Sequence, residues 1–201
     1  MNTPNKLSLT RILAIPAILL FLLPIEIGSF SPEAWNLFVL SEGRWIAGVL
    51  FILASITDYA DGKIARKNNL VTNLGKFLDA LADKMLVLSV FIALVGMGRL
   101  ASVWVILIVF REVMVTGLRG IAVEQGVVIA AKMPGKIKTV TQMIAIIFIL
   151  FETLFVKIPG LNHPNLIQNV GDVLFYICIV MTVYSGADYL IKHRKTLTEP
   201  Q

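Results

Sequence analysis

Residues 45–83 read WIAGVLFILASITDYADGKIARKNNLVTNLGKFLDALAD, an apolar run that becomes abruptly polar at Asp58. A second apolar run, residues 85–95, follows almost directly. The apolar parts, residues 45–57 and 85–95, are each shorter than the roughly 17 residues that a helix needs to cross a bilayer. We therefore expect both helices to continue through polar sequence at membrane depth. Charged side chains are costly there unless they face a bundle interior, a water-filled cavity or an ion.

The rest of the chain is also apolar. Hydrophobic residues make up 57% of its 201 residues and charged residues only 15%, which is too apolar for an ordinary soluble domain. We predict an all-α fold: a polytopic membrane protein with six transmembrane helices in one bundle, and a single domain over residues 1–201. The predicted helices span residues 9–27, 35–57 (or 44–57 if the helix is short), 76–97, 100–126, 139–156 and 170–192.

The basic residues indicate how this bundle is oriented. With a cytoplasmic N-terminus, only Arg44, Arg99 and Lys157 of the 18 Lys and Arg residues fall on the outer side. Positive charge concentrates on the cytoplasmic side of membrane proteins, so we expect both termini in the cytoplasm. The net charge of +5 does not indicate nucleic acid as a partner, because the basic residues lie between apolar spans. They are better explained as topology signals and as partners for anionic lipid or phosphate.

Two pairs of aspartates flank the polar turn. Asp58 and Asp61 are three residues apart and Asp79 and Asp83 four apart, so each pair shares one face of its helix. If the turn brings the two helices together, the pairs converge. Four adjacent carboxylates cannot all stay ionised without cations, because repulsion and burial raise their pKa values. All-oxygen sites favour hard divalent ions, so we predict a site for magnesium, calcium or manganese.

Two features of this segment leave alternatives open. The aspartates could instead be solvated helix-end charges that pair with nearby cations, namely Lys63, Arg66, Lys76 and Lys84. Gly62, Ala65 and Gly75 are small, and glycine inside a helix costs about 1 kcal/mol relative to alanine. Small residues permit close approach either of a ligand such as a nucleotide or of a neighbouring helix.

The whole segment fits the pattern D-x2-D-G-x2-A-R-x8-G-x3-D-x3-D and resembles the signature of the CDP-alcohol phosphotransferase family. Every fixed position is present: Asp58, Asp61, Gly62, Ala65, Arg66, Gly75, Asp79 and Asp83. Residues 4–11 (PNKLSLTR), 111–119 (REVMVTGLR) and 135–142 (GKIKTVTQ) are similar to the branch of that family whose acceptor is sn-glycerol 3-phosphate. The first of these departs from the branch by a shift of one residue.

The resemblance implies a reaction and a place for it. A phosphatidyl group would pass from CDP-diacylglycerol to sn-glycerol 3-phosphate, giving phosphatidylglycerol phosphate and CMP. It also implies a homodimer in a bacterial plasma membrane, with the active site facing the cytoplasm. Direct in-line displacement requires positioning and charge stabilisation more than a protein nucleophile.

The resemblance also assigns roles to residues. It implies that Asp58, Asp61 and Asp79 bind the metal, Mg²⁺ or Mn²⁺, and that Asp83 is the general base and also contacts a metal. The residues that it places at the CDP-lipid are Asn5, Asp61, Gly62, Ala65, Arg66 and Gly75.

A second basic cluster suggests how an acceptor could bind. Arg111 and Arg119 are eight residues apart and can share a helix face, and Lys136 follows near the start of the next predicted helix. An acceptor that carries a phosphate needs such donors, and arginine can bind it with two parallel hydrogen bonds. We assign Thr10, Arg111, Arg119 and Lys136 to the acceptor phosphate. Alternatively, the cations only anchor the protein at the membrane interface.

Two other functions remain open at this point. The same chemistry could act on another acceptor, such as an inositol phosphate. A metal-ion transporter would also place carboxylates at membrane depth. Against a transporter, the acids cluster towards one side, and no second polar layer continues to the outer face.

The orientation can be tested directly. A reporter enzyme that is active only in the cytoplasm, fused after Gln201, should be active, because six spans return the chain to the side on which it started. The same reporter fused in the predicted outer loop at Lys157 should be inactive. An inactive C-terminal fusion that is still expressed would contradict the six-helix topology.

Overall fold

A computed structural model describes residues 3–26, 28, 30–67, 73–124 and 133–198, with side chains for residues 10–26, 28, 30–57, 81–122 and 133–192. This part of the chain is almost entirely helical, which confirms the predicted all-α class. The elements are α1 (Thr3–Leu22), α2 (Glu33–Phe38), a π-helical segment η1 (Val39–Gly43), α3 (Arg44–Lys67), α4 (Asn73–Gly96), α5 (Ser102–Glu124), α6 (Met133–Val156) and α7 (Pro164–Thr198).

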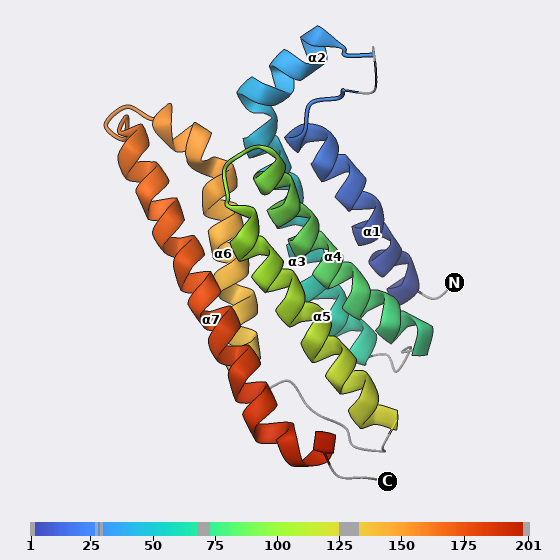
Figure 1. Ribbon diagram of the computed structural model, residues 1–201. Coiled ribbons are helices and arrows are strands. Elements are labelled where there is room, and N and C mark those ends of the chain that lie inside the picture. Colours follow the sequence, from blue (N-terminus) through green and yellow to red (C-terminus); the bar gives the residue numbers. More distant parts are fainter. Residues whose placement is uncertain (1–2, 27, 29, 68–72, 125–132, 199–201) are drawn as a thin grey trace.

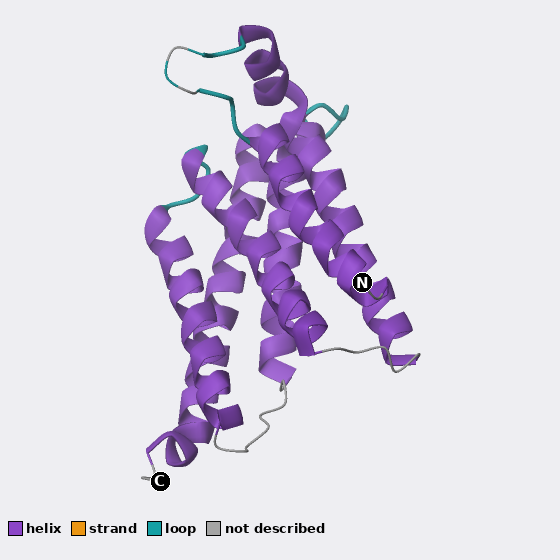
Figure 2. Cartoon of the chain, turned by 90° about the vertical axis from the view of Figure 1, so that its right-hand side faces the viewer, coloured by secondary structure: helices purple, strands orange, loops and turns teal. Residues whose placement is uncertain are grey.

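The six long helices lie side by side in one bundle (Figures 1 and 2). Helix α1 packs on both α3 and α4, α3 packs on α6, and α6 packs on α7. Helix α5 closes the circuit by contacting α7 and α4, and α4 also reaches α6 across the interior. Buried side chains fill that interior, among them Phe51, Phe91, Ile108, Ile149 and Phe175. Each comes from a different helix, so the core is formed by the bundle as a whole.

Several helix boundaries differ from those predicted. Helix α1 ends at Leu22 rather than at residue 27, because the residue before a proline disfavours helical geometry and Pro24 follows. Helix α7 begins at Pro164, earlier than residue 170; proline suits the first helical position because no helical partner is needed for its missing N–H. Helix α6 begins at Met133 instead of residue 139, so Lys136 and Lys138 lie inside the helix.

A network of ion pairs joins the helices at the end of the bundle where α2 lies. Arg99 donates to both carboxylate oxygens of Glu152, at 2.9 and 2.6 Å, and to Asp172 at 2.6 Å. Arg44 donates to Glu152 at 3.0 Å. The hydrogen bonds to Glu152 raise the pKa of Arg99 above its ordinary value. At Gly171 an added Cβ would lie 2.2 Å from Glu152 Oε1, so glycine lets α7 approach this network.

The outer surface of the bundle is strongly apolar. On α5, the side chains of Ile106, Phe110 and Val113 are 65–67% exposed. Apolar surface of this extent is expected to face a membrane or a partner. Within the described residues, three helical stretches are long and apolar enough to cross a membrane: Glu33–Thr57, Met133–Val156 and Pro164–Lys192. This finding is consistent with a membrane protein, whereas the count of six spans stays a prediction.

Candidate functional site

The two helices that carry the aspartate pairs are present and are joined at one end of the bundle. Asp58 and Asp61 lie in the last turns of α3, and Asp79 and Asp83 lie in the first half of α4. Figure 1 shows the last turns of α3 and the first turns of α4 at the same end of the bundle, so the two pairs belong to that end. An all-carboxylate donor set of this kind fits a hard divalent cation.

The finer geometry of the predicted metal and CDP sites lies outside the described residues. The side chains of Asp58, Asp61 and Asp79, and those of the remaining predicted CDP-lipid residues Asn5, Gly62, Ala65, Arg66 and Gly75, are among the undescribed ones. Among the side chains that are described, no group of three His, Cys, Asp or Glu residues is close enough to hold a metal. The metal ligands therefore stay a prediction.

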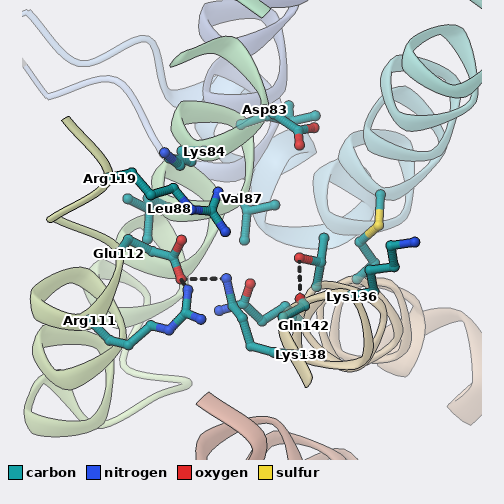
Figure 3. A pocket seen from close by; sticks show the side chains of 14 residues that line it. Asp83, Lys84, Val87, Leu88, Arg111, Glu112, Arg119, Lys136, Lys138 and Gln142 are labelled. Atoms are coloured by element: carbon teal, nitrogen blue, oxygen red, sulfur yellow. Dashed lines mark hydrogen bonds and ion pairs between the residues drawn. The ribbon is translucent and has the colours of Figure 1, made fainter. Parts of the chain in front are cut away.

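A polar cavity of about 300 Å³ lies beside Asp83, between α4, α5 and α6 (Figure 3). Its polar lining residues are Asp83, Lys84, Arg111, Glu112, Arg119, Lys136, Lys138, Thr139 and Gln142. The structure thus brings the predicted base together with three of the residues assigned to the acceptor phosphate. These residues come from three separate helices, so the cavity exists only in the folded bundle.

The described lining of the cavity has an excess of positive charge. Among the residues whose side chains are described, five cations line it, Lys84, Arg111, Arg119, Lys136 and Lys138, against two carboxylates. A recess with charge of one sign and low-dielectric walls concentrates ligands of the opposite sign. The chemistry of the lining therefore suits an anion such as a phosphate.

Glu112 organises the buried cations of this cavity. Its carboxylate accepts from Arg111 at 3.1 Å and also pairs with Lys138, as Figure 3 shows. Arg111 is held from its other side by Ser185 of α7, whose hydroxyl accepts at 2.9 Å. All of these side chains are buried or nearly so. The Arg111 guanidinium is consequently fixed in position before any ligand arrives.

Arg119 and Lys136 are placed differently. The Arg119 guanidinium lies 5.8 Å from the centre of the Tyr189 ring, within range of a cation–π contact. Lys136 is exposed, and Figure 3 shows its ammonium extending away from Glu112. Lys84 donates to the Thr116 hydroxyl at 2.6 Å. The cavity therefore combines a fixed, buried cation pair with cations nearer to solvent.

Thr10 is not brought into this cavity. It lies on α1 with an exposed side chain, and it is not among the described residues that line the space between α4, α5 and α6. Its predicted role at the acceptor phosphate gains no support from the structure.

Five polar residues of the cavity were not assigned from the sequence as binding residues: Lys84, Glu112, Lys138, Thr139 and Gln142. A signal for two of them was present. Gln142 follows Lys138 by four residues and so shares its helix face, and Glu112 precedes Arg119 by seven. Lys138 is buried and paired with Glu112.

The family relationship follows from sequence comparison. A family model described as CDP-alcohol phosphatidyltransferase matches residues 1–184. The chain belongs to this family. The resemblance drawn from the aspartate motif is therefore confirmed.

Several relatives are similar over nearly the whole chain. One, from Bacillus subtilis (strain 168), is 40% identical over 98% of this chain and 97% of its own length. Another, from Rickettsia bellii (strain RML369-C), is 37% identical over 94% of this chain and 93% of its own. A third, from Shigella flexneri serotype 5b (strain 8401), is 32% identical over 98% of both chains. All three are named CDP-diacylglycerol–glycerol-3-phosphate 3-phosphatidyltransferase.

The buried ion pair in the cavity predicts a stability effect. Glu112→Leu removes the carboxylate with which Arg111 and Lys138 pair, and breaking a buried pair in this way should lower the free energy of unfolding by about 3 kcal/mol. Adding Lys138→Met should recover much of that loss, because one of the unpaired charges is then also removed. Unfolding in detergent micelles measures both effects, with Val113→Leu on the same helix as a control. Equal stability of the single and double variants would contradict the pairing.

Proposed function

We propose that this protein is a membrane enzyme that transfers the phosphatidyl group of CDP-diacylglycerol to sn-glycerol 3-phosphate and releases CMP. The observation that carries the proposal is the cavity that Asp83 shares with Arg111, Arg119 and Lys136. Family membership and the intact aspartate motif support the reaction class, and the activity for which the relatives are named supports the acceptor.

The donor lipid binds at the end of the bundle where α3 meets α4. The metal is held there by Asp58, Asp61 and Asp79. Asp83 follows Asp79 by four residues. The CDP group lies along the small and basic positions of the motif and the start of α1, namely Asn5, Asp61, Gly62, Ala65, Arg66 and Gly75. When bound, Mg²⁺ or Mn²⁺ supplies charge neutralisation for the pyrophosphate and for the departing CMP.

The acceptor binds in the cavity between α4, α5 and α6. Its phosphate pairs with Arg111, Arg119 and Lys136, and the excess of cations supports this assignment. Asp83 accepts the proton of the acceptor hydroxyl as that oxygen attacks the lipid-side phosphorus. The new P–O bond forms while the bond from that phosphorus to the CMP oxygen breaks, so no covalent enzyme intermediate is needed.

The membrane arrangement is part of the same proposal. Helices α1, α4 and α5 also cross the membrane, so that together with the three apolar stretches there are six spans. Both termini lie in the cytoplasm, and the active site faces the cytoplasm. The distribution of Lys and Arg supports this orientation, and the bacterial relatives support a plasma membrane. The enzyme forms a homodimer.

The reaction is tested with purified protein, CDP-diacylglycerol, Mg²⁺ or Mn²⁺ and a panel of acceptors. CMP release should require sn-glycerol 3-phosphate. No release with any acceptor would refute the proposal, and release with an inositol phosphate alone would change the acceptor.

Asp83→Asn should remove the proton acceptor while keeping the shape of the side chain. We expect kcat to fall by roughly 10²–10⁴-fold, the usual contribution of a general base. Binding of CDP-diacylglycerol, measured by calorimetry in micelles, should change much less. Near-normal turnover would exclude Asp83 as the base.

Arg119→Ala should weaken acceptor binding selectively. Losing a hydrogen bond to a charged group costs about 1.5–3 kcal/mol, so the KM for sn-glycerol 3-phosphate should rise by roughly 10–100-fold. The KM for CDP-diacylglycerol should change little. Lys157→Ala removes an exposed cation at the opposite end of the bundle and serves as the control. Equal increases in both KM values would contradict a role at the acceptor phosphate.

A further inference from the structure

Gln142 is a buried side chain whose amide nitrogen has no partner among the described residues. It lies on α6, is 2% exposed and lines the polar cavity. Within the described part of the chain, its Nε2 donates no hydrogen bond. Other polar groups of the cavity are engaged: Arg111 and Lys138 pair with Glu112, and the Thr139 hydroxyl donates to the Gly135 carbonyl at 3.1 Å. The Nε atoms of Arg111 and Arg119 are also buried there without a partner, but each of these guanidiniums makes another contact, whereas the Gln142 amide nitrogen has no partner among the described residues.

An unpartnered donor in a buried position is unfavourable, and few native side chains tolerate it without a reason. Here the reason is the cavity itself, because a molecule that enters it can supply the missing acceptor. The volume of about 300 Å³ is at the lower end of the range for small-molecule sites. The free amide therefore indicates a contact with bound ligand.

The neutral carboxamide suggests which part of a ligand it contacts. A phosphate is matched by charged donors, and the cavity provides these in Arg111, Arg119, Lys136 and Lys138. A carboxamide both donates and accepts hydrogen bonds, as a hydroxyl does, so the two groups are complementary. Gln142 also lies six residues beyond Lys136, about 9 Å further along α6 and away from the helix start.

We propose that Gln142 is a specificity-determining residue, whose carboxamide hydrogen-bonds the acceptor hydroxyl that does not react. This inference rests on the proposed function. In sn-glycerol 3-phosphate that group is the central hydroxyl, between the phosphate and the hydroxyl that attacks. A site built to bind a hydroxyl rejects an analogue that lacks it, because the buried amide is then left unpaired.

The test compares two acceptors that differ in this hydroxyl alone. The analogue 3-hydroxypropyl phosphate keeps the phosphate and the reacting hydroxyl of sn-glycerol 3-phosphate and lacks the central one. The wild-type enzyme should prefer sn-glycerol 3-phosphate in kcat/KM by about tenfold or more, as expected for one buried hydrogen bond. Gln142→Met should lower kcat/KM for sn-glycerol 3-phosphate by that factor and leave the analogue unchanged.

The matched control is Ile144→Leu, which changes an exposed apolar residue of the same helix that is not among the described residues lining the cavity. It should keep the wild-type preference. Gln142→Met should also unfold in detergent at the wild-type temperature or above it, because it removes a buried unpaired donor.

Each alternative result has a distinct meaning. A wild-type enzyme that uses both acceptors equally, or a Gln142→Met variant that loses activity equally towards both, would overturn the specificity role. A lower unfolding temperature would also overturn it, because the amide would then support the fold. An absence of CMP release by the wild-type enzyme with either acceptor would instead refute the proposed function.

Discussion

Glu112 is a buried carboxylate in a largely apolar bundle, and it neutralises the charge of two cations that are themselves buried or nearly so. Arg111 on the same helix and Lys138 on α6 both pair with its oxygens. Charges in such surroundings are stable only when opposite charges or hydrogen bonds compensate for the lost water. The pairing links α5 to α6, and among the described lining residues it leaves an excess of cations. The shape of the cavity and its preference for an anion therefore depend on the same carboxylate.

Charged side chains are arranged differently at the two ends of the bundle. At the end near α2, the Arg99 and Arg44 guanidiniums are matched by Glu152 and Asp172, and the network joins α3, α6 and α7. At the other end, cations outnumber carboxylates among the described residues that line the cavity. The first arrangement joins the helices and stabilises their packing. Among its described residues, the second has more cations than carboxylates and a buried amide nitrogen without a partner, which suits a site that binds an anionic ligand.

The proposed reaction divides its tasks between these elements. In this proposal, the motif at the junction of α3 and α4 binds the donor lipid and its metal. The cavity between α4, α5 and α6 binds the acceptor. Asp83 belongs to both, because it lies in the motif by sequence and in the cavity by structure. A base at this junction can receive a proton from the acceptor beside the phosphorus that is attacked.

The sequence by itself determined the helical class, the aspartate motif and the family, because helical spacing and apolar runs are local properties of the chain. It also indicated Arg111 and Arg119, whose separation places them on one face. Only the tertiary structure showed that Glu112 pairs with Lys138 and that Gln142 is buried beside the cavity. It also separated Thr10 from the cavity lining. These features depend on which helices are neighbours, and residues far apart in the chain carry no local pattern that specifies their contact.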